Sequence, residues 1–253
     1  MSCWNFAETV YRLGEGPTAD HPALIHDDLI ISYAELRRRA SGIASYLNSL
    51  ALPAGSHVGH YLRNSNAYME MFVGSGLAGH AHVNVNYRYR DEELIGLANG
   101  LDLRVLVYDA EFADRVAAIR DRLEATVAFI EVGGDEPVAD FAVSLVSLYD
   151  HATDDFQTST SSDDLILIAT GGTTGLPKGT QWRNEDLWRK MGTSTHMALE
   201  PLQLKDHPAE LTEHVRNVGS LPSPPAFLSL SPLMHGAGLM TAILMIAQGV
   251  PVA

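Results

Sequence analysis

Cysteine is nearly absent from this chain of 253 residues, which contains only Cys3. A single cysteine cannot form an intramolecular disulfide, and the first residues do not show the basic-then-apolar pattern of a secretory signal. The most apolar late stretch, 226–253, is interrupted by proline, histidine, glutamine and glycines too often for a lipid-exposed span. These absences predict a cytoplasmic protein without a transmembrane segment.

Basic residues are also scarce, because 17 Lys and Arg stand against 31 Asp and Glu and give a net charge of -14. This balance argues against general affinity for nucleic acid or for an anionic membrane. An anionic ligand would have to be captured locally, by backbone amides, hydroxyls and a few placed cations. The 46% hydrophobic and 19% charged residues are those of a globular chain with one large core or two smaller ones.

The first part of the chain predicts a hairpin followed by a long helix. Residues 23–31 resemble two short strands with Asp27 and Asp28 at the turn. Ser32 and Glu35 fit a capping box, and apolar residues then recur on one helical face as far as a break at 52–55. We interpret Arg37, Arg38 and Arg39 as the solvated face of this helix.

Strand and helix patterns alternate after residue 57. The predicted strands are 58–62, 81–85, 104–108, 127–132 and 165–169, and the predicted helices are 66–77, 91–98 and 111–123. Such alternation is typical of βαβ units. The predicted fold class is therefore α/β, with mostly parallel sheets flanked by helices.

Two polar regions and the chain end bear on domain organisation. Residues 150–164 predict an exposed connector between subdomains, and the proline-containing residues 200–225 predict a mobile loop. The last residues, 250–253, follow a Gln248-Gly249 turn and resemble a strand. Because domains seldom stop inside a core strand, we expect a truncated chain, and a native protein ending at Ala253 by mass spectrometry would contradict this.

The segment after the strand 165–169 has the composition of a phosphate-binding loop. Four glycines, three threonines and one lysine occur within the ten residues 170–179. Glycines allow successive backbone N–H groups to converge on an anion, while hydroxyls and Lys178 add donors and charge. A plain hairpin connector is the alternative, but a turn needs neither the hydroxyls nor the lysine.

This loop is not a Walker A loop, because Pro177 precedes Lys178 and Gly179 follows it. Residues 180–182 look extended. We therefore expect the loop to join two strands, without a helix N-terminus to supply its field.

The segment 170–179 resembles the signature loop of the AMP-forming synthetase and ligase superfamily, which includes acyl-CoA synthetases, luciferases and nonribosomal peptide adenylation domains. Gly171 stands where serine is commoner, and Ala169 where an aromatic residue is usual. Residues 84–90 and 231–238 resemble further motifs of the superfamily, and 180–186 resembles a branch that activates long-chain or sterol-derived acids. Nearly the whole chain fits the N-terminal part of such an enzyme.

The resemblance implies a reaction and its participants. ATP with Mg²⁺ and a carboxylic acid would give an acyl-adenylate and pyrophosphate, and coenzyme A would then displace AMP. Thr170, Lys178 and His235 would be catalytic, with Thr170 also near the metal. The nucleotide would be held by Thr170, Gly171, Gly172, Thr173, Thr174, Gly175 and Lys178.

His235 follows Pro232 at the start of a predicted helix. The resemblance places it, with Gly236 and Gly238, beside the acyl and adenylate groups, whereas a histidine bonded to the helix backbone is the alternative. The small residues after His235 suggest room for substrate. His80 and His82 share a strand face, but no cysteine or carboxylate cluster accompanies them to suggest a metal site.

Three hypotheses stay open from the sequence. The chain is a portion of a carboxylate–CoA ligase, a portion of an adenylation domain that loads a carrier-protein thiol, or a noncatalytic fragment that binds nucleotide or an acyl group. The resemblance implies that later acidic motifs, a hinge and a small C-terminal domain with its own lysine are missing. The acyl substrate and the oligomeric state, including a homo-oligomer, are not determined.

Overall fold

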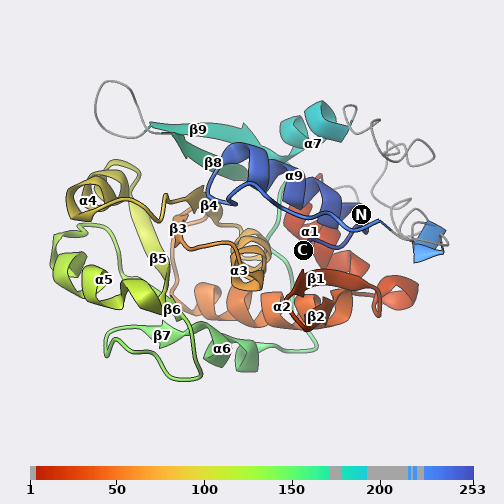
Figure 1. Ribbon diagram of the computed structural model, residues 1–253, viewed down its shortest axis with the longest axis horizontal. Helices are drawn as coiled ribbons and strands as arrows, with labels where there is room; N and C mark the ends of the chain where they lie inside the picture. The colour runs from red at the N-terminus through yellow and green to blue at the C-terminus, as the bar shows by residue number, and fades with distance from the viewer. Residues whose placement is uncertain (1–3, 171–177, 193–215, 218, 221–224) are drawn as a thin grey trace.

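The computed structural model describes residues 4–170, 178–192, 216–217, 219–220 and 225–253 (Figure 1). Most of the loop predicted at 200–225 lies outside these residues. Among the described residues, no helix is both long enough and apolar enough to cross a bilayer.

The predicted hairpin and its helix are confirmed. Strands β1 (Pro22–His26) and β2 (Leu29–Ser32) pair antiparallel, and Asp27 adopts φ 50° at their turn. Helix α2 (Tyr33–Ser49) begins after Ser32, whose Oγ accepts a hydrogen bond from the Glu35 N–H at 3.2 Å. This cap satisfies one of the amides that the first turn leaves unpaired.

Apart from the β1–β2 hairpin, the described strands form one larger sheet in the order β7-β6-β5-β3-β4-β8-β9 (Figure 1). Its members are β3 (His57–Tyr61), β4 (Ala81–Asn84), β5 (Leu103–Asp109), β6 (Ala128–Val132), β7 (Val143–Ser144), β8 (Leu165–Thr170) and β9 (Lys178–Arg183). All neighbours are parallel except β8 and β9. The predicted α/β class with a mostly parallel sheet is confirmed.

Helices cover both faces of this sheet. On one face lie α1 (Phe6–Leu13), α2, α3 (Asn66–Leu77) and α9 (Gly236–Ala247), and on the other α4 (Asp91–Gly100) and α5 (Ala113–Ile119). The side chains of β5 alternate between these faces. Val105 and Val107 belong to the core on the side of α1, α2, α3 and α9, and Leu106 and Tyr108 to the core on the side of α4 and α5. Two cores therefore share one sheet.

The chain changes face between neighbouring strands. Strand β3 continues into α3 on one face, whereas the adjacent β4 continues into α4 on the other. The carboxyl ends of β3 and β4 are thus the point where the connections diverge. In open α/β sheets, ligands bind in the crevice beyond such ends.

The structure also contains elements that the sequence patterns did not predict. These are α1, β7, α6 (Leu145–Leu148) and α7 (Asn184–Gly192), and the single helix expected at 111–123 is α5 flanked by the 3₁₀ turns Ala110–Phe112 and Arg120–Arg122. The strand expected at 250–253 appears only as isolated bridges of Val252 with Leu24 and Phe227.

The interpretation of three arginines as one solvated face is wrong for Arg39. Its Nη1 lies 3.0 Å from Oε1 of Glu70, a carboxylate buried on α3. The hydroxyl of Tyr149 also donates to Glu70. Burial raises the pKa of Glu70, and these two partners oppose the rise. Arg38 alone of the three is exposed, and it pairs with Glu35.

Candidate functional site

The predicted phosphate loop leaves β8 and returns in β9. The two strands pair from Leu165↔Arg183 to Thr170↔Lys178, so the backbones of Thr170 and Lys178 lie side by side at the end of the ladder. The prediction that the loop joins two strands is confirmed. Residues 171–177, and the side chains of Thr170 and Lys178, lie outside the described residues. The roles of Gly171, Gly172, Thr173, Thr174 and Gly175 therefore stay predictions.

His235 is the N-cap residue of α9, as the sequence predicted for a helix start. Its backbone is extended, with φ -109° and ψ 142°, and its N–H donates to the carbonyl of Pro232 at 2.9 Å. The side chain is exposed and makes no capping hydrogen bond. The alternative of an imidazole bonded to the helix backbone is therefore not what the structure has.

The start of α9 packs directly against β8. A Cβ placed on Gly236 would lie 3.3 Å from Cγ2 of Ile168, two residues before Thr170. Figure 1 shows α9 lying alongside β8 in the same way. The structure thus brings His235 and Gly236 close to the strand that leads into the predicted phosphate loop.

Gly238 allows a close backbone approach within this motif. A Cβ at Gly238 would lie 2.5 Å from the carbonyl oxygen of Pro232 and 2.8 Å from that of Ser231. The space next to Gly238 is therefore filled by the turn at 231–232 rather than left open. A contact between Gly238 and substrate stays a prediction.

A side chain that the sequence analysis did not single out holds the turn before His235. Asn64, just after β3, accepts a hydrogen bond from the Leu233 N–H at 2.7 Å and donates to the Ser231 carbonyl at 3.3 Å. The Asn-Ser pair after a predicted strand was the available signal. Only the fold reveals its partner, 169 residues along the chain.

Charged groups meet at the same carboxyl edge of the sheet. Asp109, which ends β5, accepts a hydrogen bond from the Arg63 N–H at 2.7 Å. Burial raises the pKa of Asp109 to about 6, and the Arg63 amide opposes that rise. The Arg63 guanidinium pairs with Glu111 and lies 4.8 Å from the centroid of the Tyr87 ring. The loops after β3, β4 and β5 are therefore joined beside the turn that carries His235.

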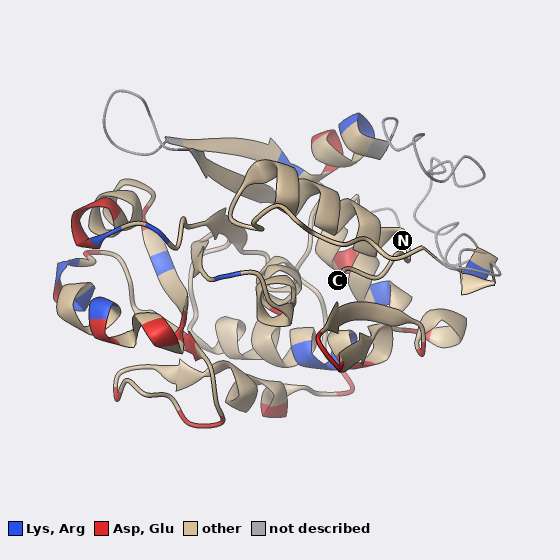
Figure 2. Ribbon diagram, viewed as in Figure 1, with Lys and Arg blue, Asp and Glu red and all other residues tan. Residues whose placement is uncertain are grey.

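The charged residues of the described part of the chain lie outside β8 and α9. Figure 2 shows β8 and α9 without charged residues, while Asp and Glu gather on α4, α5 and the loop between β6 and β7.

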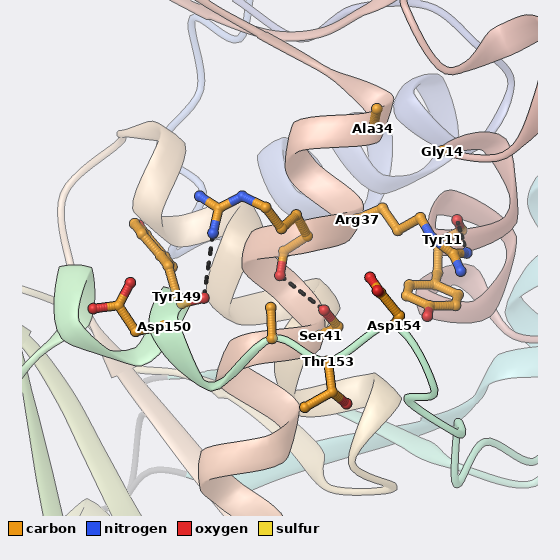
Figure 3. A pocket seen from close by; sticks show the side chains of 11 residues that line it. Tyr11, Gly14, Ala34, Arg37, Ser41, Tyr149, Asp150, Thr153 and Asp154 are labelled. Atoms are coloured by element: carbon orange, nitrogen blue, oxygen red, sulfur yellow. Dashed lines mark hydrogen bonds between the residues drawn. The ribbon is translucent and has the colours of Figure 1, made fainter.

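A cavity of about 550 Å³ lies elsewhere, between α1, α2 and the 3₁₀ turn Tyr149–His151 (Figure 3). Arg37 points along it toward Tyr11, with the guanidinium 3.8 Å from the ring centroid. This arginine pairs with Glu15, and Arg38 pairs with Glu35. None of the predicted site residues lines this cavity, so it is separate from the candidate site.

The predicted histidine pair is arranged differently from a metal site. His82 lies in β4, but its Nδ1 contacts Nδ1 of His60 on β3 at 3.1 Å, and His80 precedes the strand. Among the described residues, no three His, Cys, Asp or Glu side chains are grouped so as to hold a metal ion. His80 and His82 therefore support no metal proposal.

Comparisons with known proteins agree with this geometry. The sequence model of a family described as "AMP-binding enzyme" matches residues 14–253. A 3-oxocholest-4-en-26-oate--CoA ligase of Rhodococcus rhodochrous is 32% identical over 85% of this chain and 38% of its own length. A medium-chain acyl-CoA ligase, Mig, of Mycobacterium avium is 32% identical over 88% of this chain and 43% of its own length. The chain thus spans about two fifths of these relatives.

Solved structures share the fold at lower identity. A long-chain-fatty-acid-CoA ligase of Archaeoglobus fulgidus superposes with a TM-score of 0.74 and 19% identity, over 98% of this chain and 46% of that one. A fatty acyl CoA synthetase of Mycobacterium tuberculosis gives 0.73 and 20%, over 98% and 44%. At this identity the superpositions support the fold alone.

Proposed function

Because the chain belongs to the AMP-binding enzyme family, we propose that it forms the nucleotide-binding part of an AMP-forming acyl-CoA ligase. The parent enzyme activates a carboxylic acid of the long-chain or sterol-derived class. It consumes ATP and coenzyme A, and it uses Mg²⁺ together with ATP. This substrate class rests on the resemblance of residues 180–186 and on the names of the relatives, which include ligases for 3-oxocholest-4-en-26-oate and for medium- and long-chain fatty acids.

One observation carries the proposal. Thr170 and Lys178 are paired across β8 and β9, so the glycine- and threonine-rich turn 171–177 begins and ends at one point of the sheet, close to the start of α9. Amides, hydroxyls and one ammonium group are the donors that a triphosphate chain requires. The predicted loop leaves β8 at the carboxyl edge of the parallel strands, which is where open α/β sheets bind ligands.

In the proposed first step, a carboxylate oxygen of the acid attacks the α-phosphorus of ATP, and the bond to pyrophosphate breaks. Thr170, Thr173, Thr174 and Lys178 hold the departing phosphates, and the glycines permit close backbone approach. His235 lies at the acyl side of the same centre. In the second step the thiol of coenzyme A attacks the acyl carbon, and AMP leaves.

The test is carboxylic acid-dependent exchange of pyrophosphate into ATP by the full-length parent enzyme. We expect exchange with long-chain or sterol-derived acids, followed by thioester formation with coenzyme A. Exchange followed by transfer only to a carrier-protein thiol would refute the ligase assignment. Absence of exchange with every acid of a broad panel would refute adenylate formation itself.

The 253 residues alone are expected to bind ATP weakly or not at all and to catalyse negligible exchange. The resemblance assigns later acidic motifs and a second lysine to the rest of the parent. Fatty-acid-dependent pyrophosphate exchange measured with the isolated chain would contradict this expectation.

A further inference from the structure

The backbone ladder between β4 and β8 is short. These strands pair only at His82↔Ile166 and Val83↔Leu167. Beyond this point, the chain after β4 stays hydrogen-bonded to β3, because the Val85 N–H donates to the His60 carbonyl at 3.1 Å. The sheet therefore opens between β4 and β8 just before Thr170.

The side chain of Asn84 continues the pairing across this opening. Its Oδ1 accepts a hydrogen bond from the Ala169 N–H at 2.6 Å, and its Nδ2 lies 3.4 Å from the Ala169 carbonyl. Ala169 is the residue before Thr170. Asn84 therefore holds both backbone groups of the last residue before the predicted phosphate loop begins.

The same amide group also holds the start of the second motif. Nδ2 of Asn84 donates a hydrogen bond to the carbonyl of Met234, the residue before His235. Asn84 and Met234 are each 2% exposed, so the bond between them is shielded from water, whereas Ala169 is partly exposed. One buried side chain thus joins the residue before Thr170 to the residue before His235.

Only a side chain with both an acceptor and a donor can make this connection. Aspartate would keep the bond from the Ala169 N–H but present an oxygen to the Met234 carbonyl. Leucine would leave both the Ala169 N–H and the Met234 carbonyl without this partner. Asn64 fixes the preceding residue through the Leu233 N–H. The turn before His235 is therefore held at two points, although the His235 side chain makes no capping bond.

We propose that Asn84 is a positioning residue that sets the distance between the end of β8, from which the predicted phosphate loop leaves, and His235. The inference rests on the proposed function, because it assigns these two motifs to the phosphate side and the acyl side of one reaction centre. Asn84 touches neither reactant. It acts by holding the backbones of Ala169 and Met234 at a fixed separation. Its loss therefore misaligns the carboxylate and the α-phosphorus.

Asn184 provides a matched control at the opposite end of β8. It is 5% exposed, accepts a hydrogen bond from the Phe6 N–H at 3.0 Å and donates to the Asp164 carbonyl at 2.9 Å. This asparagine also bridges two backbone segments, but it contacts neither motif. A substitution there reports the cost of losing a buried asparagine alone.

The first test compares Asn84→Asp with Asn184→Asp in the full-length parent, by pyrophosphate exchange. We expect Asn84→Asp to lower kcat by about 100-fold while KM for ATP changes less than about threefold. Asn184→Asp is expected to change kcat less than about threefold. An equal loss of kcat in both variants, or no loss in Asn84→Asp, would overturn the proposal.

The second test needs no activity and uses amide hydrogen exchange in the 253-residue chain. In Asn84→Leu, the amides of Ala169 and His235 should both exchange at least about tenfold faster, whereas Asn184→Leu should leave both unchanged. Unchanged protection of either amide in folded Asn84→Leu overturns the link. If the wild-type parent forms no adenylate, the proposed function fails, and this exchange experiment still decides whether Asn84 joins the two motifs.

Discussion

The buried contact between His60 and His82 should make the fold sensitive to acid. Burial lowers the pKa of His60 to about 3, and burial together with the His60 ring lowers the pKa of His82 well below its usual value. The two Nδ1 atoms lie 3.1 Å apart, so one must donate the hydrogen that the other accepts. Protonation of the accepting Nδ1 would leave two donors facing each other. Both rings are therefore neutral in the folded protein.

The sign of the effect follows from these depressed pKa values. The stabilisation is present above the unfolded pKa of about 6.5 and is lost as the pH falls below it, because only the unfolded state then takes up protons. In that range, the contribution of each histidine to the free energy of unfolding falls by about 1.4 kcal/mol per pH unit. Between pH 8 and pH 5 the loss is about 2 kcal/mol for each ring and about 4 kcal/mol for the pair. Domains of this kind have total stabilities of about 5–15 kcal/mol, so the loss should be easy to measure.

The assay is urea unfolding of wild type and His60→Gln, followed by circular dichroism from pH 8 to pH 5. The free energy of unfolding of His60→Gln should fall by about 2 kcal/mol less than that of wild type over this range. Asp109 has a raised pKa and contributes with the opposite sign, but it is present in both proteins and cancels in the difference. His26→Gln, at an exposed histidine, is the control and should keep the wild-type pH dependence. Identical pH profiles for wild type and His60→Gln would refute the reasoning.

Two further predictions concern packing and charge. Gly238→Ala should lower the free energy of unfolding by about 1–3 kcal/mol, because the new methyl group meets the backbone carbonyls of the preceding turn. Gly100→Ala places its methyl group where no atom lies within 4 Å, so it should be neutral or stabilise by up to about 1 kcal/mol. Equal urea midpoints for the two variants would contradict this. Arg39→Met should cost about 3–5 kcal/mol because it leaves the Glu70 carboxylate buried without its cation, while Arg38→Met should cost less than about 1 kcal/mol. Urea unfolding that ranks Arg38→Met as the more damaging change would show that the buried pair has been misjudged.

Local patterns predicted the parts of the fold that depend on neighbours in sequence. The helix at 66–77 has the predicted bounds, and the Ser32 cap and the turn at Asp27 are where composition placed them. The strand on each side of the phosphate loop could also be predicted, because 165–169 is a short apolar run and 180–182 look extended.

Features fixed by distant contacts could not be predicted. Helix α1 is capped by Asn5 locally, but it is anchored by Phe6 packing on Trp188, with ring centroids 4.5 Å apart. Arg39 was interpreted as solvated because its partner Glu70 lies on another helix. The strand order, and with it the roles of Asn64 and Asn84, depends on which strands become neighbours, which periodicity does not encode.

The central claim is that the turn between β8 and β9 holds the phosphates of ATP, and Lys178→Ala in the full-length parent tests it most directly. The measurement compares the two half-reactions of wild type and variant, namely adenylate formation from acid and ATP, and thioester formation from preformed adenylate and coenzyme A. We predict that adenylate formation slows by about 100-fold or more while thioester formation keeps the wild-type rate. An equal loss in both half-reactions, or no loss in the first, would contradict the claim.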